Sequence, residues 1–248
     1  MKPIRIRGEP ATYPLICAPL VGAGRDLLRA EAAAALAARA DIVEWRVDHF
    51  RDIANLRSVI ETGRALRRAA PGVPLLFTRR SVAEGGQPVP LGEGEIVALY
   101  EAVCAEGIAE LVDFEMASSA ASMAAVRDAS RRHGVGLVCS FHDFGRTPPL
   151  AELTARFRRA AELGGDVAKV SVMARGPEDA LTLLAALQSS RELAPALIGV
   201  SMGPHGALSR IAGFLFGSAL TFGVAAAGSA PGQMPIGELR AAIELLRG

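Results

Sequence analysis

The sequence predicts a single (β/α)8 barrel, an α/β fold with parallel strands and an active site at the C-terminal ends of those strands. Its 248 residues are close to the roughly 250 that one such barrel needs. Short apolar runs alternate with alanine-rich helical segments eight times, about 30 residues apart. No change of composition marks a second domain, so we expect one barrel over residues 1–248, with 1–12 a short N-terminal extension.

Each expected strand is a short run rich in Val, Ile and Leu, and a helical segment follows it. The strands are expected at 15–20, 42–47, 75–80, 111–116, 136–141, 167–173, 196–202 and 220–225. The helices are expected at 26–39, 53–69, 93–106, 119–133, 150–163, 178–193, 209–216 and 237–246. Residues 4–7 alternate like a short edge strand, which we expect to cover the bottom of the barrel. The uncharged stretch 211–237 contains six glycines and is read as core rather than as a membrane helix.

Composition excludes several classes of partner. A formal charge of +1 and a pI of about 7.8 give no electrostatic reason to expect a nucleic acid or a membrane surface. Three cysteines without a CxxC pair fit a reducing compartment and argue against a zinc site, so no metal is expected. The N-terminus lacks the apolar segment of a secretory signal, which predicts a cytoplasmic protein.

Strand periodicity places charged side chains inside the predicted barrel. In 42–47 and just after it, Glu44, Arg46 and Asp48 share one face, while the apolar residues between them face the helices. The same rule turns inward Thr78, Arg80, Asp113, Glu115, Ser140, His142, Lys169 and Ser171, and leaves Arg79 toward the helices or the rim. Buried charges are costly unless they are paired or functional, so an internal ion-pair network is one interpretation. The other is an active site, which this fold carries at that end.

Lys169 is the candidate nucleophile. The chain has 25 arginines and two lysines, Lys2 and Lys169. An interior strand is a poor place for a charge, and lysine differs from arginine in that it can lose its proton and attack a ketone to form a Schiff base. The alternative is a lysine at a strand end that extends its ammonium to solvent.

Three loops at the same end of the barrel carry further candidates. Glu84 precedes the glycine pair of 85–86, which permits a tight turn that returns the carboxylate over the mouth. Arg210 lies in the first turn of the helix after 201–208, where helix N-termini and arginines favour an anion, a carboxylate or a phosphate. The loop 228–233 has the composition of a lid. His133 is expected in solvent, whereas His49 and His205 lie in mouth-side loops.

Taken together, the motifs of the sequence resemble those of the type I 3-dehydroquinate dehydratases, from the first strand to the last helix. The motifs that carry the resemblance are Glu44-Trp45-Arg46-Val47-Asp48, Phe77-Thr78-Arg79-Arg80-Ser81 with Glu84-Gly85-Gly86, His142-Asp143-Phe144, Ala168-Lys169-Val170, Ser201-Met202-Gly203 through Ser209-Arg210, and Ser229-Ala230-Pro231-Gly232-Gln233. Each is weak alone, but six in order at barrel-compatible spacing make chance similarity improbable.

The resemblance implies an enzyme of the shikimate pathway that dehydrates 3-dehydroquinate to 3-dehydroshikimate without metal or cofactor. Lys169 would form an imine with the C3 ketone, His142 would act as general base and then general acid, and Glu84 would orient His142. Arg210 would pair with the substrate carboxylate. The other expected substrate-binding residues are Glu44, Arg46, Arg80, Met202, Ser229 and Gln233. The family also implies a homodimer.

Some residues depart from the family pattern, and two other functions stay open. Ala18 stands where many relatives carry a serine near the substrate, which removes one hydroxyl contact, and His205 stands where some relatives have lysine. One alternative is a class I aldolase acting on a phosphorylated sugar, with Arg210 binding the phosphate. The other is a sensor that binds a quinate-type ligand without catalysis, although a sensor has no need of Lys169, His142 and Glu84 together.

Overall fold

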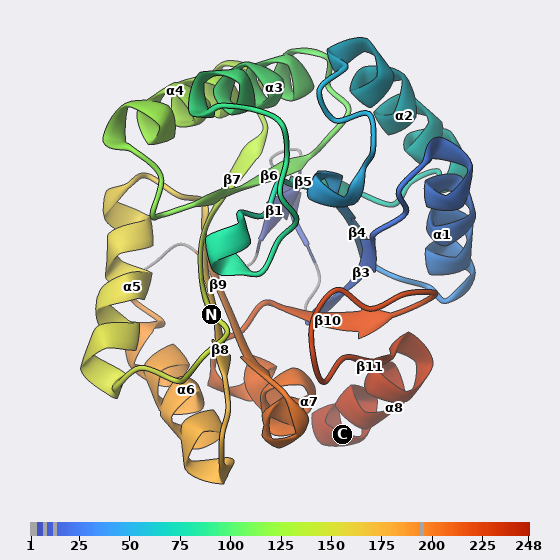
Figure 1. Cartoon of the computed structure of the whole chain (residues 1–248). Helices are drawn as coiled ribbons and strands as arrows, with labels where there is room; N and C mark the ends of the chain where they lie inside the picture. Colours follow the sequence, from blue (N-terminus) through green and yellow to red (C-terminus); the bar gives the residue numbers. More distant parts are fainter. Residues whose placement is uncertain (1–3, 7–8, 12–13, 194–195) are drawn as a thin grey trace.

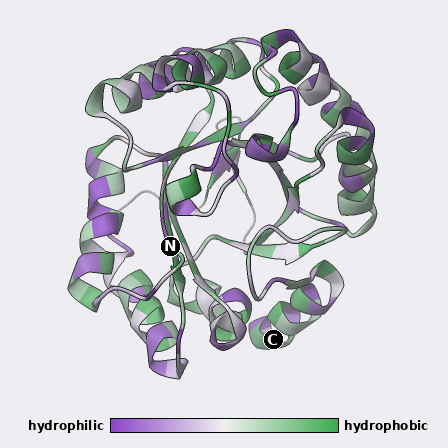
Figure 2. Ribbon diagram, viewed as in Figure 1, coloured by the Kyte–Doolittle hydropathy of each residue, from purple (hydrophilic) through white to green (hydrophobic). Residues whose placement is uncertain are grey.

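The computed structural model describes residues 4–6, 9–11, 14–193 and 196–248. It shows a ring of helices around a curled parallel sheet, viewed along the barrel axis in Figure 1. This confirms the predicted (β/α)8 class. Hydrophobic and hydrophilic residues are interspersed along the outer helices in Figure 2, as expected for helices with one face on the sheet and the other in water.

The strands of the large sheet follow the predicted alternation. They are β3 (Leu15–Leu20), β4 (Ile42–Arg46), β5 (Leu75–Thr78), β6 (Leu111–Glu115), β7 (Gly136–Asp143), β8 (Val167–Met173), β9 (Ala196–Met202), β10 (Leu220–Val224) and β11 (Met234–Pro235). The helices are α1 (Arg25–Ala37), α2 (Leu56–Ala69), α3 (Glu93–Ala105), α4 (Ala120–Arg132), α5 (Leu150–Glu162), α6 (Pro177–Ser190), α7 (Ala207–Phe216) and α8 (Ile236–Arg247). The described chain also forms 3₁₀ helices at the mouth, namely η1 (Val47–His49), η2 (Val82–Glu84) and η3 (Pro204–Gly206).

Neighbouring strands pair in parallel in the order β11-β10-β3-β4-β5-β6-β7-β8-β9. Within the described residues the sheet thus contains nine parallel strands, one more than predicted, because the two-residue β11 extends it beside β10. Between β9 and β10 the described chain forms a parallel bridge, Leu197 to Ser218. There the N–H of Ala219 donates to the carbonyl of Leu197 at 2.7 Å, which brings the two ends of the curled sheet together.

Several predicted boundaries were wrong by a few residues. The strand predicted over 42–47 ends at Arg46, and the one predicted over 75–80 ends at Thr78, because a mouth-side loop begins at each point. Conversely, β7 runs two residues beyond the predicted end at Phe141, so His142 lies on the strand. The ends of the α-helices differ from the predicted ends by three residues or fewer. The 3₁₀ helices are absent from the prediction.

The barrel has two apolar layers, one on each side of the sheet. Between sheet and helices lies a core that includes the edge-to-face aromatic series Trp45, Phe77, Tyr100 and Phe114. Inside the barrel, a second cluster is formed by the inward residues of most strands. It begins at the N-terminal ends of the strands and reaches the mouth along β9 and β10 through Val200, Met202 and Phe222. Because this layer fills the interior, the barrel is closed below the polar mouth.

An N-terminal hairpin lies at the bottom of this interior cluster. The two-residue strands β1 (Arg5–Ile6) and β2 (Glu9–Pro10) pair antiparallel, and Ile4, which is 1% exposed, packs into the interior cluster. The edge strand predicted over 4–7 therefore exists as β1, although Arg7 lies outside the described residues. As expected, the segment covers the bottom of the barrel.

Carboxylates placed just before alternate strands tie the bottom of the sheet together. Asp41, Glu110 and Asp166, here called the strand-start carboxylates, precede β4, β6 and β8, and each accepts the N–H of a residue at the start of the preceding strand. The donors are Ile16, Leu75 and Leu137, each at 2.8 Å, and the partner arginines are Arg240, Arg67 and Arg127. These bonds fix strand register at the end opposite the mouth.

Candidate active site

A cleft that is open at its mouth lies at the C-terminal ends of the strands. It is lined by Glu44, Arg46, Arg80, Glu84, His142, Phe144, Lys169, Ser171, Val200, Met202, Arg210, Phe222, Ser229 and Ala230. Nine of the ten residues predicted for the site are in this set. Most of the inward charged residues thus line one cleft, and they form ion pairs with each other or with Asp48, Asp113 and Glu115.

Lys169 is buried on the inward face of β8. Its Nζ lies 2.8 Å from Asp113 Oδ2 and 3.3 Å from Glu44 Oε1, and 4.8 Å from the centre of the Phe222 ring. The residue is 3% exposed, so the alternative of a lysine reaching into solvent is wrong. The two carboxylates hold the amino group against the floor of the cleft.

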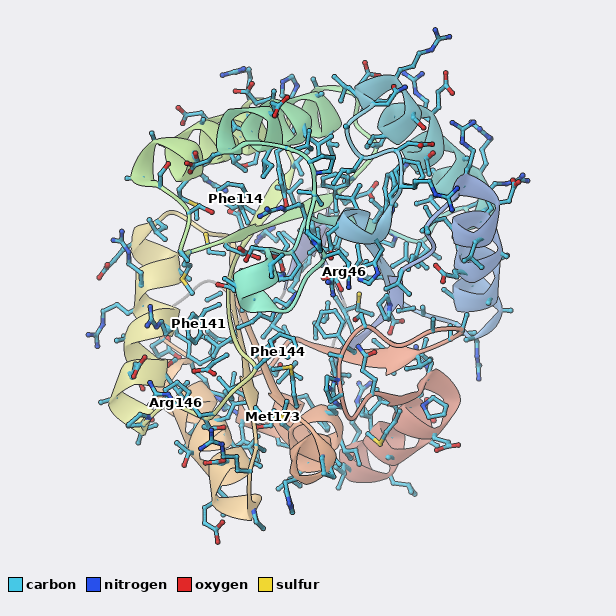
Figure 3. All side chains as sticks on the ribbon, in the orientation of Figure 1. Arg46, Phe114, Phe141, Phe144, Arg146 and Met173 are labelled. Carbon is cyan, nitrogen blue, oxygen red and sulfur yellow. The ribbon has the colours of Figure 1, made fainter. Side chains whose placement is uncertain are left out.

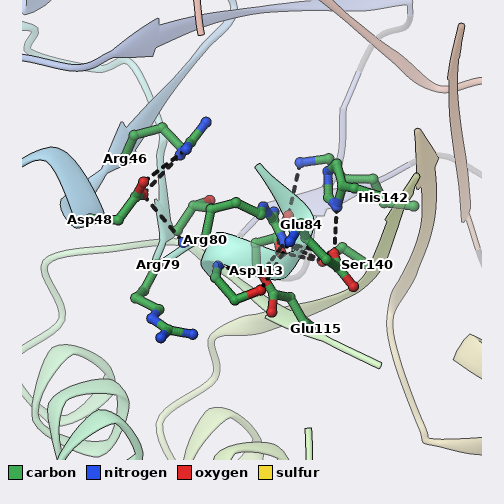
Figure 4. Close-up of polar contacts among 12 residues, drawn as sticks. Arg46, Asp48, Arg79, Arg80, Glu84, Asp113, Glu115, Ser140 and His142 are labelled. Carbon is green, nitrogen blue, oxygen red and sulfur yellow. Dashed lines mark hydrogen bonds and ion pairs between the residues drawn. The ribbon is translucent and has the colours of Figure 1, made fainter. Parts of the chain in front are cut away.

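Arg80 connects the surroundings of Lys169 to those of His142. Its Nη2 lies 2.8 Å from Asp113 Oδ1, and its Nη1 lies 3.1 Å from Glu115 Oε1 and 3.5 Å from Glu84 Oε2 (Figure 4). Burial acts to lower the pKa of Arg80, but Asp113 and Glu115 raise it above its usual range. In return, although burial alone would raise the pKa of Asp113, the charges of Arg80 and Lys169 hold it well below its usual range. Asp113 is therefore a permanent anion.

His142 pairs with Glu84 at the mouth. The distance between His142 Nδ1 and Glu84 Oε2 is 2.8 Å, which leaves Nε2 to exchange a proton with a ligand. Burial, reinforced by the charges of Arg80 and Lys169, lowers the pKa of His142 well below its ordinary value of about 6.5. Burial likewise raises the pKa of Glu84 to about 8, against the opposing effect of Arg80. The imidazole is therefore neutral at physiological pH, as a general base must be.

The predicted glycine turn carries Glu84 over the mouth. Glu84 ends the 3₁₀ helix η2, and Gly85 follows with a φ of 83°, a conformation that favours glycine. A Cβ on Gly85 would lie 2.4 Å from the Phe144 ring, and one on Gly86 would lie 2.1 Å from the Arg80 carbonyl oxygen. Both positions therefore require glycine for the loop to close against β7 and bring Glu84 to His142.

Arg210 is a buried cation that has no carboxylate partner in the described chain. Its Nη1 donates to the carbonyl of Phe222 at 3.4 Å and its Nη2 to that of Pro231 at 3.0 Å, and its Nε has no hydrogen-bond partner there. The side chain is 2% exposed, and burial lowers its pKa to about 10. A buried guanidinium that faces a cleft without a counter-ion is suited to bind an anion.

Two more predicted site residues are held in place by neighbouring side chains or backbone groups. Arg46 makes a two-point pair with Asp48, at 2.9 and 2.8 Å, and its charge is thereby balanced. Gln233 is the predicted site residue that does not line the cleft. Its Oε1 accepts the N–H of Ser229 at 2.8 Å, so it shapes the loop that presents Ser229.

Ala18 does not lie where the sequence had suggested. It pairs with Val43 in the sheet and belongs to the helix-facing core, whereas Pro19 pairs with Glu44 and shares its inward face. The expectation that Ala18 removes a substrate contact is therefore wrong, because one step along a strand reverses the face.

His133 and His205 are exposed and His49 lies near Asp48, and none of these histidines lines the cleft.

One wall of the cleft had not been predicted. Phe144, Val200, Phe222 and Ala230 form, with Met202, an apolar wall opposite the charged residues of β4 to β8. Figure 3 shows Phe144 and Arg46 over the central part of the barrel, while Phe141 lies toward α5. Sequence patterns carry little signal for this wall, because apolar residues that line a ligand cleft have the same composition as apolar residues of the core.

Together, the barrel and this half-charged, half-apolar cleft have the form of an enzyme active site. A family model described as type I 3-dehydroquinase matches residues 16–248. The chain is 48% identical over 250 residues to the 3-dehydroquinate dehydratase of Albidiferax ferrireducens, covering 99% of this chain and 95% of that protein.

Solved structures agree. The 3-dehydroquinate dehydratase from Geobacillus kaustophilus superimposes with a TM-score of 0.95 at 44% identity, covering 99% of this chain and 96% of that one. A type I enzyme from Clostridium difficile gives 0.92 at 35% identity, covering 98% and 96%. The chain therefore belongs to the type I 3-dehydroquinate dehydratase family, a family of hydro-lyases in the shikimate pathway. This family membership decides in favour of the dehydratase over the aldolase and the sensor.

Two findings bear on other ligands and surroundings. Within the described residues, no group of three His, Cys, Asp or Glu side chains is arranged to hold a metal ion. Among the helices of the described chain, none is both long and apolar enough to cross a membrane.

Proposed function

We propose that the enzyme dehydrates 3-dehydroquinate through an imine on Lys169, with His142 as general base and general acid. The observation that carries this proposal is the common cleft. Lys169 Nζ is held by Asp113 and Glu44 on one side of Arg80, and the His142–Glu84 pair is held on the other. A nucleophile and a neutral base thus face one small volume.

Imine formation starts from the Lys169 ammonium. Asp113 is held as an anion by Arg80, so Glu44, 3.3 Å from Nζ, is the nearest group suited to accept a proton and free the amine. The amine nitrogen then bonds to C3, and the C3 oxygen leaves as water with two protons that were on the ammonium. The product is a protonated imine, and no external acid is consumed.

Elimination follows from the electron demand of the iminium. His142 Nε2 removes the proton from C2, and the electron pair moves toward the iminium nitrogen to form an enamine. The enamine then expels the C1 hydroxyl, which leaves as a second water with the proton from His142. Hydrolysis of the remaining imine consumes one water and releases 3-dehydroshikimate and Lys169. The net change is loss of one water from the substrate.

The substrate carboxylate is assigned to Arg210. That guanidinium is the buried cation of the cleft without a carboxylate partner in the described chain, whereas Arg46 and Arg80 are already neutralised by Asp48, Asp113 and Glu115. The ring would then lie between the polar wall, which offers Glu44 and Arg46 to its hydroxyls, and the apolar wall of Met202 and Phe222. A relative supports covalent chemistry in the family, since the Clostridium difficile enzyme was crystallised with covalently modified comenic acid.

The variant Lys169→Arg tests the assignment of the nucleophile. Arginine keeps the charge beside Asp113 but cannot supply a neutral amine at neutral pH. We expect folded protein with activity reduced by at least about 10⁴-fold, measured by the absorbance of the enone product. Retained turnover in a correctly folded Lys169→Arg protein would remove the imine from the mechanism.

A further inference from the structure

Ser171 differs from the other polar side chains that line the cleft. Each of those, from Glu44 to Ser229, hydrogen-bonds or pairs with another group of the described chain. Ser171 lines the same cleft, and among the described residues its hydroxyl has no hydrogen-bond partner. A polar group left unmatched by the protein is free to bind a ligand.

The fold places this hydroxyl beside both reacting groups. Ser171 follows Lys169 by two residues on β8, so the two side chains share the inward face. The sheet register pairs Ser171 with His142 on β7, and strands so paired lie about 4.8 Å apart. Although the residue is only 5% exposed, its oxygen is not among the fully enclosed atoms that lack a partner, so the exposed part of the side chain includes the hydroxyl.

Packing alone does not require a serine here. If position 171 had only to fill space between β7 and β9, alanine would do so without the cost of a largely buried hydroxyl that no group of the described chain satisfies. Ser140, which precedes His142 by two residues on β7, differs from Ser171 in this respect. Its hydroxyl donates to Asp113 and accepts from Arg80.

We propose that Ser171 is a further substrate-contacting residue, whose hydroxyl hydrogen-bonds the C3 oxygen of the substrate while the imine on Lys169 forms and breaks. This inference rests on the proposed imine mechanism. When Lys169 nitrogen bonds to C3, the former carbonyl oxygen becomes a hydroxyl and must leave as water. Ser171 is positioned to hold that oxygen while it takes up the two protons that came from the Lys169 ammonium and leaves as water. The same contact holds the attacking water when the product imine is hydrolysed.

The test compares Ser171→Ala with Ser201→Ala. Ser201 is a matched control, because its hydroxyl on β9 is buried and without a partner in the described chain but lies outside the cleft lining. Enzyme is mixed with 3-dehydroquinate, quenched with borohydride at short times, and the reduced adduct on Lys169 is counted by mass spectrometry. Because one hydrogen bond is lost, we expect the rate of adduct formation and kcat/KM to fall roughly 3- to 10-fold in Ser171→Ala. In Ser201→Ala both quantities should keep their wild-type values.

A second readout identifies the step. If imine formation becomes slower, the isotope effect with substrate deuterated at C2 should shrink in Ser171→Ala, because proton removal limits the rate less. A loss caused only by altered packing would leave that isotope effect unchanged. Adduct formation in Ser171→Ala at the wild-type rate, with the wild type trapped on Lys169, would overturn the role of Ser171 alone. Absence of any adduct in the wild type would instead overturn the imine mechanism.

Discussion

At the scale of single residues, the site depends on which charges are neutralised by the protein and which are not. Arg46 and Arg80 are paired with carboxylates, whereas Arg210 donates to backbone carbonyls in the described chain. Sequence reasoning had grouped Arg46 and Arg80 together as substrate-binding residues. Their different roles depend on partners such as Asp48 and Asp113, which lie close only after folding.

Arg210 gives a test at this scale. Replacement by alanine removes a charge-assisted pair with the substrate carboxylate, so Arg210→Ala should raise KM for 3-dehydroquinate roughly 10- to 100-fold. Arg57→Ala, which alters a largely exposed arginine on α2, is the control and should leave KM unchanged. Steady-state kinetics decide the question, and an unchanged KM in Arg210→Ala would move the carboxylate to another cation.

The Glu84–His142 pair predicts a pH dependence. Burial raises the pKa of Glu84 to about 8. Below that pH the protonated Glu84 carboxyl donates to His142 Nδ1. The ring hydrogen of His142 then lies on Nε2, so Nε2 cannot accept a proton from the substrate. Above that pH the carboxylate accepts from Nδ1, and Nε2 becomes the base. The value of kcat/KM should therefore rise with pH up to about 8, and this limb should vanish in Glu84→Gln. A limb that persists in the variant would assign the ionisation to another group.

At the scale of elements, periodicity predicted the strands and their inward faces well. Lys169 and Asp113 point where alternation placed them, because a strand buried on both sides has one allowed register. Arg80 also points inward, although it lies in the loop just after the end of β5. The expectation about Ala18 came instead from the family pattern, and the strand places Ala18 on the face opposite to that of Pro19. The 3₁₀ helices and β11 escaped prediction because they are short and depend on contacts between loops, such as that of Gly232 with Gly203.

The strand-start carboxylates predict where the barrel is sensitive at the opposite end. Glu110 is 7% exposed, accepts the N–H of Leu75 and pairs with Arg67. Glu110→Ala leaves both groups with one fewer acceptor, so the free energy of unfolding should fall by about 2–4 kcal/mol, while kcat/KM should change little. Urea unfolding measures the difference, with Arg57→Ala as a control expected to cost less than about 1 kcal/mol. Equal losses in the two variants would contradict a register-fixing role.

At the scale of the whole molecule, the residues that close the barrel and those that form the candidate active site lie at opposite ends of the strands. The hairpin, Ile4 and the interior apolar cluster close one end, and the charged cleft occupies the other. The sequence predicted this division because apolar and charged inward residues occupy successive levels of the strands. The homodimer and the cytoplasmic location stay predictions, and sedimentation velocity of the purified chain tests the first of them.

The central claim is that Lys169 forms a covalent imine with the substrate. Borohydride reduces an imine to a stable secondary amine, so treatment with 3-dehydroquinate and borohydride should inactivate the enzyme and add one reduced ligand per chain. Peptide mass mapping should place that ligand on Lys169. The chain has one other lysine, Lys2, which serves as an internal control for non-specific labelling. An adduct on Lys2 alone, or full activity after treatment with no adduct, would contradict the mechanism.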